Sequence, residues 1–166
     1  MRKLWGPHSR FACLIVIAVF ILDQASKVWV LFGLDLIGRE QIHLLPFFDL
    51  VMVWNRGISY GLLEQQGDLG RWLLTVFMLV ASALLWLWVA RAGTRLLAAS
   101  LALIIGGALG NALDRVIYGA VADFARLFWG DVSWYVFNLA DAAIVAGVAL
   151  LLYDSVFGDH GKTQSR

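Results

Sequence analysis

Residues 132–153 read VSWYVFNLADAAIVAGVALLLY, and Asp141 is the one charged residue among them. An apolar run of this length can cross a bilayer as a helix. An aspartate inside such a run costs roughly 2.5–3.5 kcal/mol on membrane-insertion scales. A carboxylate retained at that cost usually faces a protein-lined, partly hydrated site. The segment Phe137–Asp141 therefore predicts a membrane-spanning element that carries functional chemistry.

The overall composition predicts an integral membrane protein. Of the 166 residues, 61% are hydrophobic and 15% are charged, whereas an average soluble domain carries about 25% charged residues. The length predicts a single domain, residues 1–166. The net charge of +1 gives no indication of a nucleic-acid partner. A single cysteine, Cys13, excludes an internal disulfide, and with three isolated histidines it suggests no metal site, so we expect neither a metal nor a cofactor.

Four segments are apolar and long enough to span the bilayer as helices. The predicted spans are residues 11–31, 72–90, 96–114 and 134–153. The first span follows a basic N-terminus but lacks a small-x-small cleavage site, so we interpret it as a retained helix and not as a secretory signal. Basic residues favour the cytoplasmic ends of spans. They occur before the first span, between the second and third, and in the tail, so we expect both termini in the cytoplasm.

Two segments between the spans are expected on the extracytoplasmic side. Residues 33–70 predict a small β unit, because Gln41–Trp54 is rich in β-branched and aromatic residues and precedes the turn sequence Asn55–Gly57. Residues 118–131 predict a short amphipathic helix lying on the membrane. The apolar residues that share one face of that helix are Val121, Phe124, Leu127 and Phe128. The predicted fold class is thus an all-α polytopic membrane protein with four transmembrane helices, a small extracytoplasmic β unit and a short interfacial helix.

Polar residues from distant parts of the chain are expected at one depth in this arrangement. Because a helix rises 1.5 Å per residue, Asp23 and Asp141 each lie roughly 20 Å from the cytoplasmic ends of their spans, and Asp114 lies roughly 28 Å from the start of its own. Asp123 and Asn55 follow in the segments predicted to cover the same surface. We therefore expect these five side chains to converge in the outer part of the bilayer.

Two pairs of polar residues are spaced so that they share a helical face. Asp23 and Lys27 are four residues apart, and they either form an internal ion pair or anchor the site from one side. Asn138 and Asp141 are three residues apart, so the amide is placed to orient the carboxylate and its substrate. Packing alone is a weak explanation for this second pair.

The segment Gly106–Arg115 combines small and polar residues. Its glycines allow close helix packing, a common device in membranes. Asn111, Asp114 and Arg115 are not explained by packing. Arg115 is placed to pair with Asp114 at the interface, which favours Asp114 as an ionised support over a carboxyl group that shares a proton.

The chemistry that these residues favour is hydrolysis by a pair of carboxyl groups. No serine lies in a nucleophile elbow, and no serine–histidine or cysteine–histidine combination is credible. Two aspartates that share one proton can activate water and protonate a carbonyl oxygen. Asp141 is one candidate, and the residues themselves leave open whether Asp123 or Asp114 is its partner.

A small proton-coupled transporter is the alternative function. Asp23, Lys27 and Asp141 would then form an intramembrane proton relay. The polar residues all lie toward one side of the bilayer, however, and the sequence has no internal repeat of the kind that transporters often carry. The peptidase hypothesis is therefore preferred.

Five motifs carry a resemblance to a known family. In order and spacing, the chain resembles bacterial lipoprotein signal peptidase (signal peptidase II) at Asp23–Lys27 (DQASK), Asn55–Tyr60 (NRGISY), Gly106–Arg115 (GGALGNALDR), Val121–Phe124 (VADF) and Phe137–Asp141 (FNLAD). Each motif alone is weak, but the series covers nearly the whole chain. One departure occurs at Ile58–Tyr60, where the family usually has Ala-Ala-Phe, so the resemblance implies less about substrate contacts of the β unit.

The resemblance implies an aspartic endopeptidase of the bacterial inner membrane. Such enzymes remove the signal peptide of prolipoproteins by cleaving just before a cysteine that carries a diacylglyceryl group, and they are sensitive to the cyclic peptide globomycin. The implied catalytic dyad is Asp123 and Asp141. The implied substrate-binding or supporting residues are Asp23, Lys27, Asn55, Gly57, Asn111, Asp114, Arg115, Asn138 and Ala140. The implied partners are prolipoproteins and membrane lipid, the active site faces the periplasm, and no cofactor is required.

Overall fold

The computed structural model describes residues 4–57, 68–130 and 132–157, and it contains four helices long and apolar enough to cross a membrane. The long helices are α1 (Ser9–Val28, continued by the short π-helix η1, Trp29–Gly33), α3 (Asp68–Val89), α4 (Arg95–Tyr118) and α5 (Leu139–Phe157). The remaining elements are the single helical turn α2 (Leu36–Arg39) and the strands β1 (Gln41–Leu45), β2 (Phe48–Asn55), β3 (Val121–Trp129) and β4 (Val132–Phe137). These four spans and the small sheet confirm the prediction of a mainly helical polytopic membrane protein with four transmembrane helices and a small β unit.

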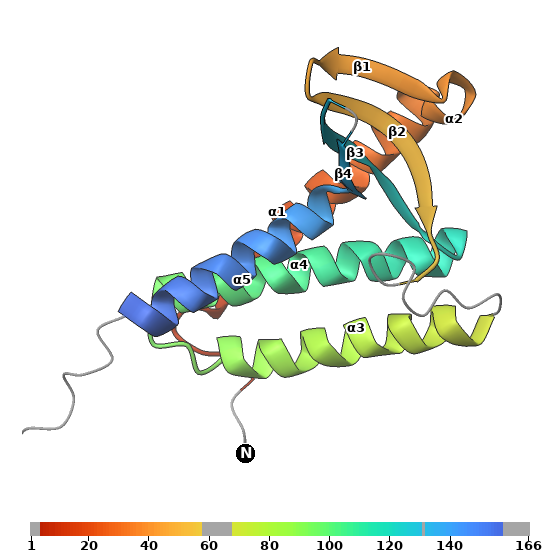
Figure 1. Ribbon diagram of the computed structural model, residues 1–166. Helices are drawn as coiled ribbons and strands as arrows, with labels where there is room; N and C mark the ends of the chain where they lie inside the picture. The colour runs from red at the N-terminus through yellow and green to blue at the C-terminus, as the bar shows by residue number, and fades with distance from the viewer. Residues whose placement is uncertain (1–3, 58–67, 131, 158–166) are drawn as a thin grey trace, which may run out of the picture.

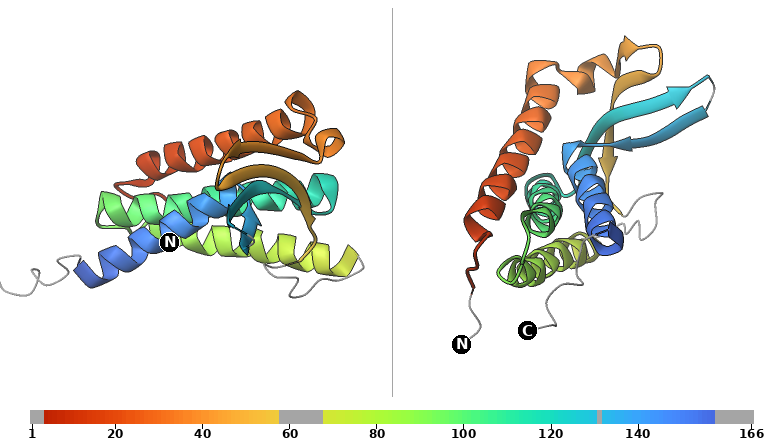
Figure 2. Two further views of the ribbon diagram at one scale, coloured as in Figure 1. Left: turned by 45° about the horizontal axis from the view of Figure 1, so that its top comes forward. Right: turned by 90° about the vertical axis from the view of Figure 1, so that its left-hand side faces the viewer.

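Helix α4 lies between the other three long helices (Figure 2). Small residues on α4 make this central position possible. A Cβ atom at Gly106 would collide with Val19 of α1, and one at Gly107 would collide with the backbone carbonyl of Ala140 in α5. Most of the apolar part of α4 is buried, whereas the other three helices expose most of theirs, as expected for helices that face lipid.

The four strands form one antiparallel sheet in the order β1-β2-β3-β4. The sheet lies at one end of the helices, beside the C-terminal ends of α1 and α4 and the N-terminal end of α5 (Figure 1). Helix α4 ends at Tyr118, and the next residue, Gly119, adopts the left-handed conformation (φ 77°) that a glycine tolerates after a helix C-terminus. The chain then turns directly into β3, which brings Asp123 back over the helix ends.

A buried carboxylate links three of the strands. Asp49 on β2 is fully buried and faces His43 on β1 and Arg126 on β3 in the sheet register. Its Oδ2 atom accepts hydrogen bonds from Arg126 Nη2 at 2.5 Å and from Gln41 Nε2 at 2.7 Å, while Oδ1 lies 2.7 Å from His43 Nδ1. This cluster ties β1 and β3 to β2, and the sequence analysis did not identify it.

The predicted interfacial helix at residues 118–131 is wrong, because this segment forms strand β3. Residues 121–125 are all buried, so both faces of the strand carry apolar side chains and the period-2 alternation that marks a half-buried strand is absent. The structural boundaries are instead Gly119 and Gly130, whose positive φ angles turn the chain at each end of the strand.

The predicted limits of the β unit and of the fourth span also need correction. The β unit predicted at residues 33–70 lacks β3 and β4, which belong to the same sheet, and residues 68–70 begin α3. The span predicted at residues 134–153 begins instead at Leu139, because Val132–Phe137 pairs with β3 as β4. The other spans differ from their predicted limits by a few residues at each end.

Candidate active site

Helix α5 begins with a reciprocal pair of hydrogen bonds that places Asp141. The backbone N–H of Asp141 donates to Asn138 Oδ1 at 3.0 Å, and the backbone N–H of Asn138 donates to Asp141 Oδ2 at 3.2 Å. This is a capping box, with Asn138 as the N-cap residue of the helix. Asn138 therefore does not lie within the span, as its spacing from Asp141 suggested, but immediately before it. The carboxylate of Asp141 lies in the first turn, where the helix dipole favours negative charge.

Asp123 reaches the same place from strand β3. Its Oδ1 atom accepts a hydrogen bond from Asn138 Nδ2 at 2.6 Å, and its Oδ2 atom accepts one from Asn55 Nδ2 at 3.0 Å. Burial and, to a smaller extent, the nearby charge of Asp141 raise the pKa of Asp123 to about 7, although the two asparagine bonds and the charge of Lys27 oppose the rise. Asn138 thus donates to both carboxylates, through its side chain to Asp123 and its backbone to Asp141.

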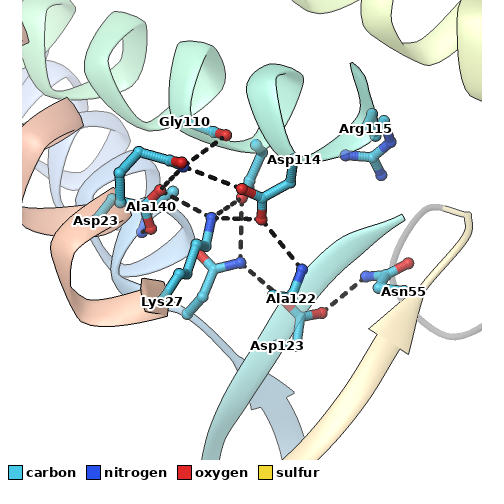
Figure 3. Close-up of polar contacts among 12 residues, drawn as sticks. Asp23, Lys27, Asn55, Gly110, Asp114, Arg115, Ala122, Asp123 and Ala140 are labelled. Carbon is cyan, nitrogen blue, oxygen red and sulfur yellow. Dashed lines mark hydrogen bonds and ion pairs between the residues drawn. The ribbon is translucent and has the colours of Figure 1, made fainter. Parts of the chain in front are cut away.

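A buried ion cluster of Asp23, Lys27 and Asp114 lies beside Asp123 (Figure 3). The ammonium group of Lys27 is 2.8 Å from Asp23 Oδ2 and 2.8 Å from Asp114 Oδ2, and the three side chains are almost completely buried. Asp114 Oδ2 also accepts the backbone N–H of Ala122 at 3.1 Å. Gln24 Nε2 lies 3.0 Å from Asp114 Oδ1 and 3.1 Å from Asp23 Oδ2. Asp114 therefore pairs with Lys27, and the predicted pairing with its neighbour Arg115 is wrong.

Asn111 on α4 connects the ion cluster to Asp141. Its Oδ1 atom accepts hydrogen bonds from Lys27 Nζ and from Asn138 Nδ2, each at 3.1 Å. Its Nδ2 atom donates to Asp141 Oδ1 at 2.8 Å. Because Oδ1 faces two donors and Nδ2 faces a carboxylate, the orientation of the amide is determined by its partners.

Two further contacts tie helices α1 and α4 to the elements around them. The backbone N–H of Ala140 donates to Asp23 Oδ1 at 3.0 Å, which joins α5 to α1. Arg115 Nη2 donates to the carbonyl oxygen of Gly57 at 2.8 Å, which joins α4 to the end of β2. In both cases a predicted supporting residue of one element binds the backbone of another.

The carboxylate of Asp141 borders two hollows. One is an apolar groove of about 620 Å³ along α5, whose lining includes Phe137, Ala142 and Val145. The other is a smaller hollow of about 210 Å³, whose lining includes Asn55 and Arg115. Asp141 can therefore be approached from both hollows.

The structure brings together the residues that the sequence analysis selected. They come from helices α1, α4 and α5, from strands β2 and β3, and from the short connections that follow β2 and precede α5. Two participants were not predicted. Gln24 contacts both aspartates of the ion cluster, and its polar character beside Asp23 inside an apolar span is the signal that identifies it. Tyr135 accepts a hydrogen bond from Asn55 at 3.0 Å, and its strand position gave no such signal. Residues 58–60, where the sequence differs from the usual family motif, lie outside the described residues.

Comparisons with known proteins identify the family. A family model described as signal peptidase (SPase) II matches residues 15–157. The lipoprotein signal peptidase of Methylorubrum extorquens is 57% identical over 147 residues, which are 89% of this chain and 86% of that protein. The lipoprotein signal peptidase of Rhodopseudomonas palustris is 51% identical over 153 residues, 90% of this chain and 93% of that protein.

A solved structure of a bacterial membrane enzyme has the same fold. It was determined by the in meso method at 2.3 Å resolution, and it matches all of this chain and 98% of its own with a TM-score of 0.79 at 22% identity. Nothing in these comparisons favours a transporter. The chain therefore belongs to the signal peptidase II family and is a multi-pass membrane protease.

Proposed function

We propose that Asp123 and Asp141 are the catalytic pair of this protease. The observation that carries the proposal is the position of Asn138. Its backbone donates a hydrogen bond to Asp141 and its side chain donates one to Asp123, so a single residue holds the two carboxylates close together. The pKa of about 7 at Asp123 supports the proposal, because a group that gains and loses protons near neutral pH is suited to acid–base catalysis.

Asp114 is assigned a supporting role. Both of its oxygen atoms are engaged, with Lys27, Gln24 and the backbone N–H of Ala122. A buried ammonium group needs a carboxylate as its counter-charge, and Asp114 supplies one, whereas the side-chain donors to Asp123 are the neutral amides of Asn55 and Asn138. Asp23 receives the same assignment, because it contacts the same ammonium group. These assignments select Asp123 over Asp114 as the partner of Asp141.

The proposed reaction uses one water molecule and one shared proton. One carboxylate removes a proton from water, whose oxygen forms a bond to the carbonyl carbon of the scissile peptide, while the other carboxyl group protonates the carbonyl oxygen. The carbon–nitrogen bond then breaks, the departing nitrogen takes the proton that came from water, and a hydroxyl proton returns to the second carboxylate. The products are a carboxyl group and a free amine, and the pair regains its single proton.

The proposed substrates are prolipoproteins cut before a diacylglyceryl cysteine. The names of the relatives support lipoprotein processing, and the apolar groove beside Asp141 is suited to a signal helix or an acyl chain. A substrate anchored in lipid reaches the pair with its depth already fixed, which lowers the entropic cost of orientation. In the same proposal the termini are cytoplasmic, the site faces the periplasm, and lipid is a partner. The enzyme is also expected to be sensitive to globomycin.

The test is cleavage of a diacylglyceryl-modified prolipoprotein by the purified protein in detergent. We expect Asp123→Asn and Asp141→Asn to lose at least about 100-fold in kcat, because each removes one acid–base group, while Asp114→Asn keeps measurable activity. Asp68→Asn is the matched control, since its carboxylate is 86% exposed at the start of α3. Each variant's apparent Tm separates lost chemistry from lost folding. Normal cleavage by folded Asp123→Asn would refute the assigned pair.

A further inference from the structure

The side chain of Tyr135 borders both hollows of the site. Among the residues lining the apolar groove and the smaller hollow, Tyr135 and Asp141 are common to the two. Tyr135 lies on strand β4, two residues before the end of that strand and six before Asp141. Its ring therefore stands where the two hollows meet, next to a proposed catalytic carboxylate.

The hydroxyl group of Tyr135 shares a donor with Asp123. Asn55 Nδ2 donates to the hydroxyl oxygen of Tyr135 at 3.0 Å and to Asp123 Oδ2 at 3.0 Å. An amide nitrogen carries two hydrogen atoms, so each acceptor receives one. The other end of the Asn55 amide is fixed as well, because its Oδ1 atom accepts the backbone N–H of Gly57 at 3.1 Å. The hydroxyl oxygen of Tyr135 is thus one of three contacts that together fix the orientation of the Asn55 amide.

We propose that Tyr135 is a positioning residue of the aspartate pair: its hydroxyl group orients the Asn55 amide, which in turn holds Oδ2 of Asp123 in the reacting orientation. This inference rests on the proposed function of Asp123 and Asp141. Asn138 holds the other oxygen of Asp123. Loosening Asn55 therefore frees one oxygen of the carboxylate while the other stays bound, so the group can rotate away from the geometry that both bonds impose.

The change that isolates this role is Tyr135→Phe, which keeps the ring and removes the hydroxyl group. We expect kcat to fall roughly 3- to 10-fold, the effect of losing one ordinary hydrogen bond, while KM changes less than about twofold. KM stays nearly constant because the ring still lines both hollows. A fall in kcat without a change in KM distinguishes an effect on the pair from lost substrate contact.

The pH dependence of kcat gives a second readout. The charged groups that face Asp123 are Asp141 on α5, Lys27 on α1 and Arg115 on α4, and all three remain in Tyr135→Phe. The hydrogen bond from Asn55 favours the ionised form of Asp123, so weakening this bond strengthens proton binding there. We expect the pH–kcat profile of the variant to move to higher pH, a displacement that a purely structural role for Tyr135 would not produce.

The decisive comparison is a double-mutant cycle in the prolipoprotein cleavage assay, with full-length protein in detergent. Tyr135→Phe is measured in the wild type and in Asn55→Ala. Tyr153→Phe is the matched control, since it removes a hydroxyl group from an exposed tyrosine near the end of α5. If Tyr135 acts through Asn55, Tyr135→Phe lowers kcat in the wild type and changes it less than about twofold in Asn55→Ala. Tyr153→Phe behaves as the wild type.

Three results would overturn the inference. They are a wild-type kcat and pH profile in Tyr135→Phe, an equal loss of kcat in the wild-type and Asn55→Ala backgrounds, and a change confined to KM. Asp123→Asn in the same assay separates this inference from the proposed function. If Asp123→Asn cleaves normally, the proposed pair is wrong, whereas if Asp123→Asn is inactive and Tyr135→Phe resembles the wild type, only the role of Tyr135 is wrong.

Discussion

Replacing Lys27 with methionine tests the energetics of the buried ion cluster. The ammonium group contacts two carboxylates at 2.8 Å, Asp23 and Asp114, and an amide oxygen at 3.1 Å, that of Asn111. Its side chain is 2% exposed and the two aspartates are fully buried. Methionine keeps an unbranched apolar stem and removes the charge. The two carboxylates would then remain buried beside each other without their shared cation.

The expected loss of stability follows from that geometry. Removing one partner of a buried ion pair costs about 3–5 kcal/mol, chiefly because a charge remains buried without compensation. Two carboxylates lose their cation here, so we place Lys27→Met in the upper part of this range. For a chain of 150–250 residues, each kcal/mol lowers Tm by about 2–4 °C. We therefore expect the apparent Tm to fall by roughly 10–20 °C.

The measurement is thermal unfolding of wild type and variants in one detergent at one scan rate, because membrane proteins often unfold irreversibly. Arg10→Met is the matched control, since it removes an exposed cation from the same helix. The double variant with Asp23→Asn and Lys27→Met should recover part of the loss, because one of the two uncompensated carboxylates is gone. If Lys27→Met lowers the apparent Tm no more than Arg10→Met does, the reasoning about the ion cluster is refuted.

Two further predictions concern Asp123 and Gly110. The pKa of Asp123 is about 7 in the folded chain against an ordinary value of 3.8, so the folded state binds this proton more tightly and stability falls as pH rises from about 4 to 7. The difference in apparent Tm between pH 5 and pH 8 should therefore be smaller in Asp123→Asn than in the wild type. An equal difference would contradict the assignment. Gly110→Ala should lower Tm and kcat because the added Cβ collides with Asp23 Oδ2, although alanine favours a helix over glycine by about 1 kcal/mol. Gly93→Ala is the control, because a Cβ atom at Gly93 would have open space around it. Equal behaviour of the two variants would refute the packing argument.

The sequence predicted the helical part of the fold because each span is defined by local composition. It also predicted which side chains meet, because depth along a helix can be counted from its ends, and the contact between Asp23 and the backbone of Ala140 agrees with that count. The strands near the helix ends were harder to recognise. Strand β3 is buried on both faces in its first half, so its apolar residues fit a helical pattern as well as an extended one.

The start of α5 was placed too early for a related reason. An apolar strand runs directly into an apolar helix, so hydropathy is continuous across Phe137 and does not show the boundary. The pattern of Asn138 followed three residues later by Asp141 is nevertheless a capping-box sequence. Interpreted as a helix start, this pattern would have placed the boundary correctly and would also have explained why the two side chains interact.

The choice between Asp114 and Asp123 depends on partners that only the fold supplies. Asp23 and Asp114 share the ammonium group of Lys27, whereas the side-chain donors to Asp123 and Asp141 are the amides of asparagines. The first two carboxylates serve as counter-charges of a buried cation, whereas neutral amides hold the second two without placing a full opposite charge in contact with them. A pair that must pass a proton between its members is therefore better held by amides than by a lysine. The lysine, one step removed through Asn111, can order the site without fixing the charge of the proposed catalytic pair.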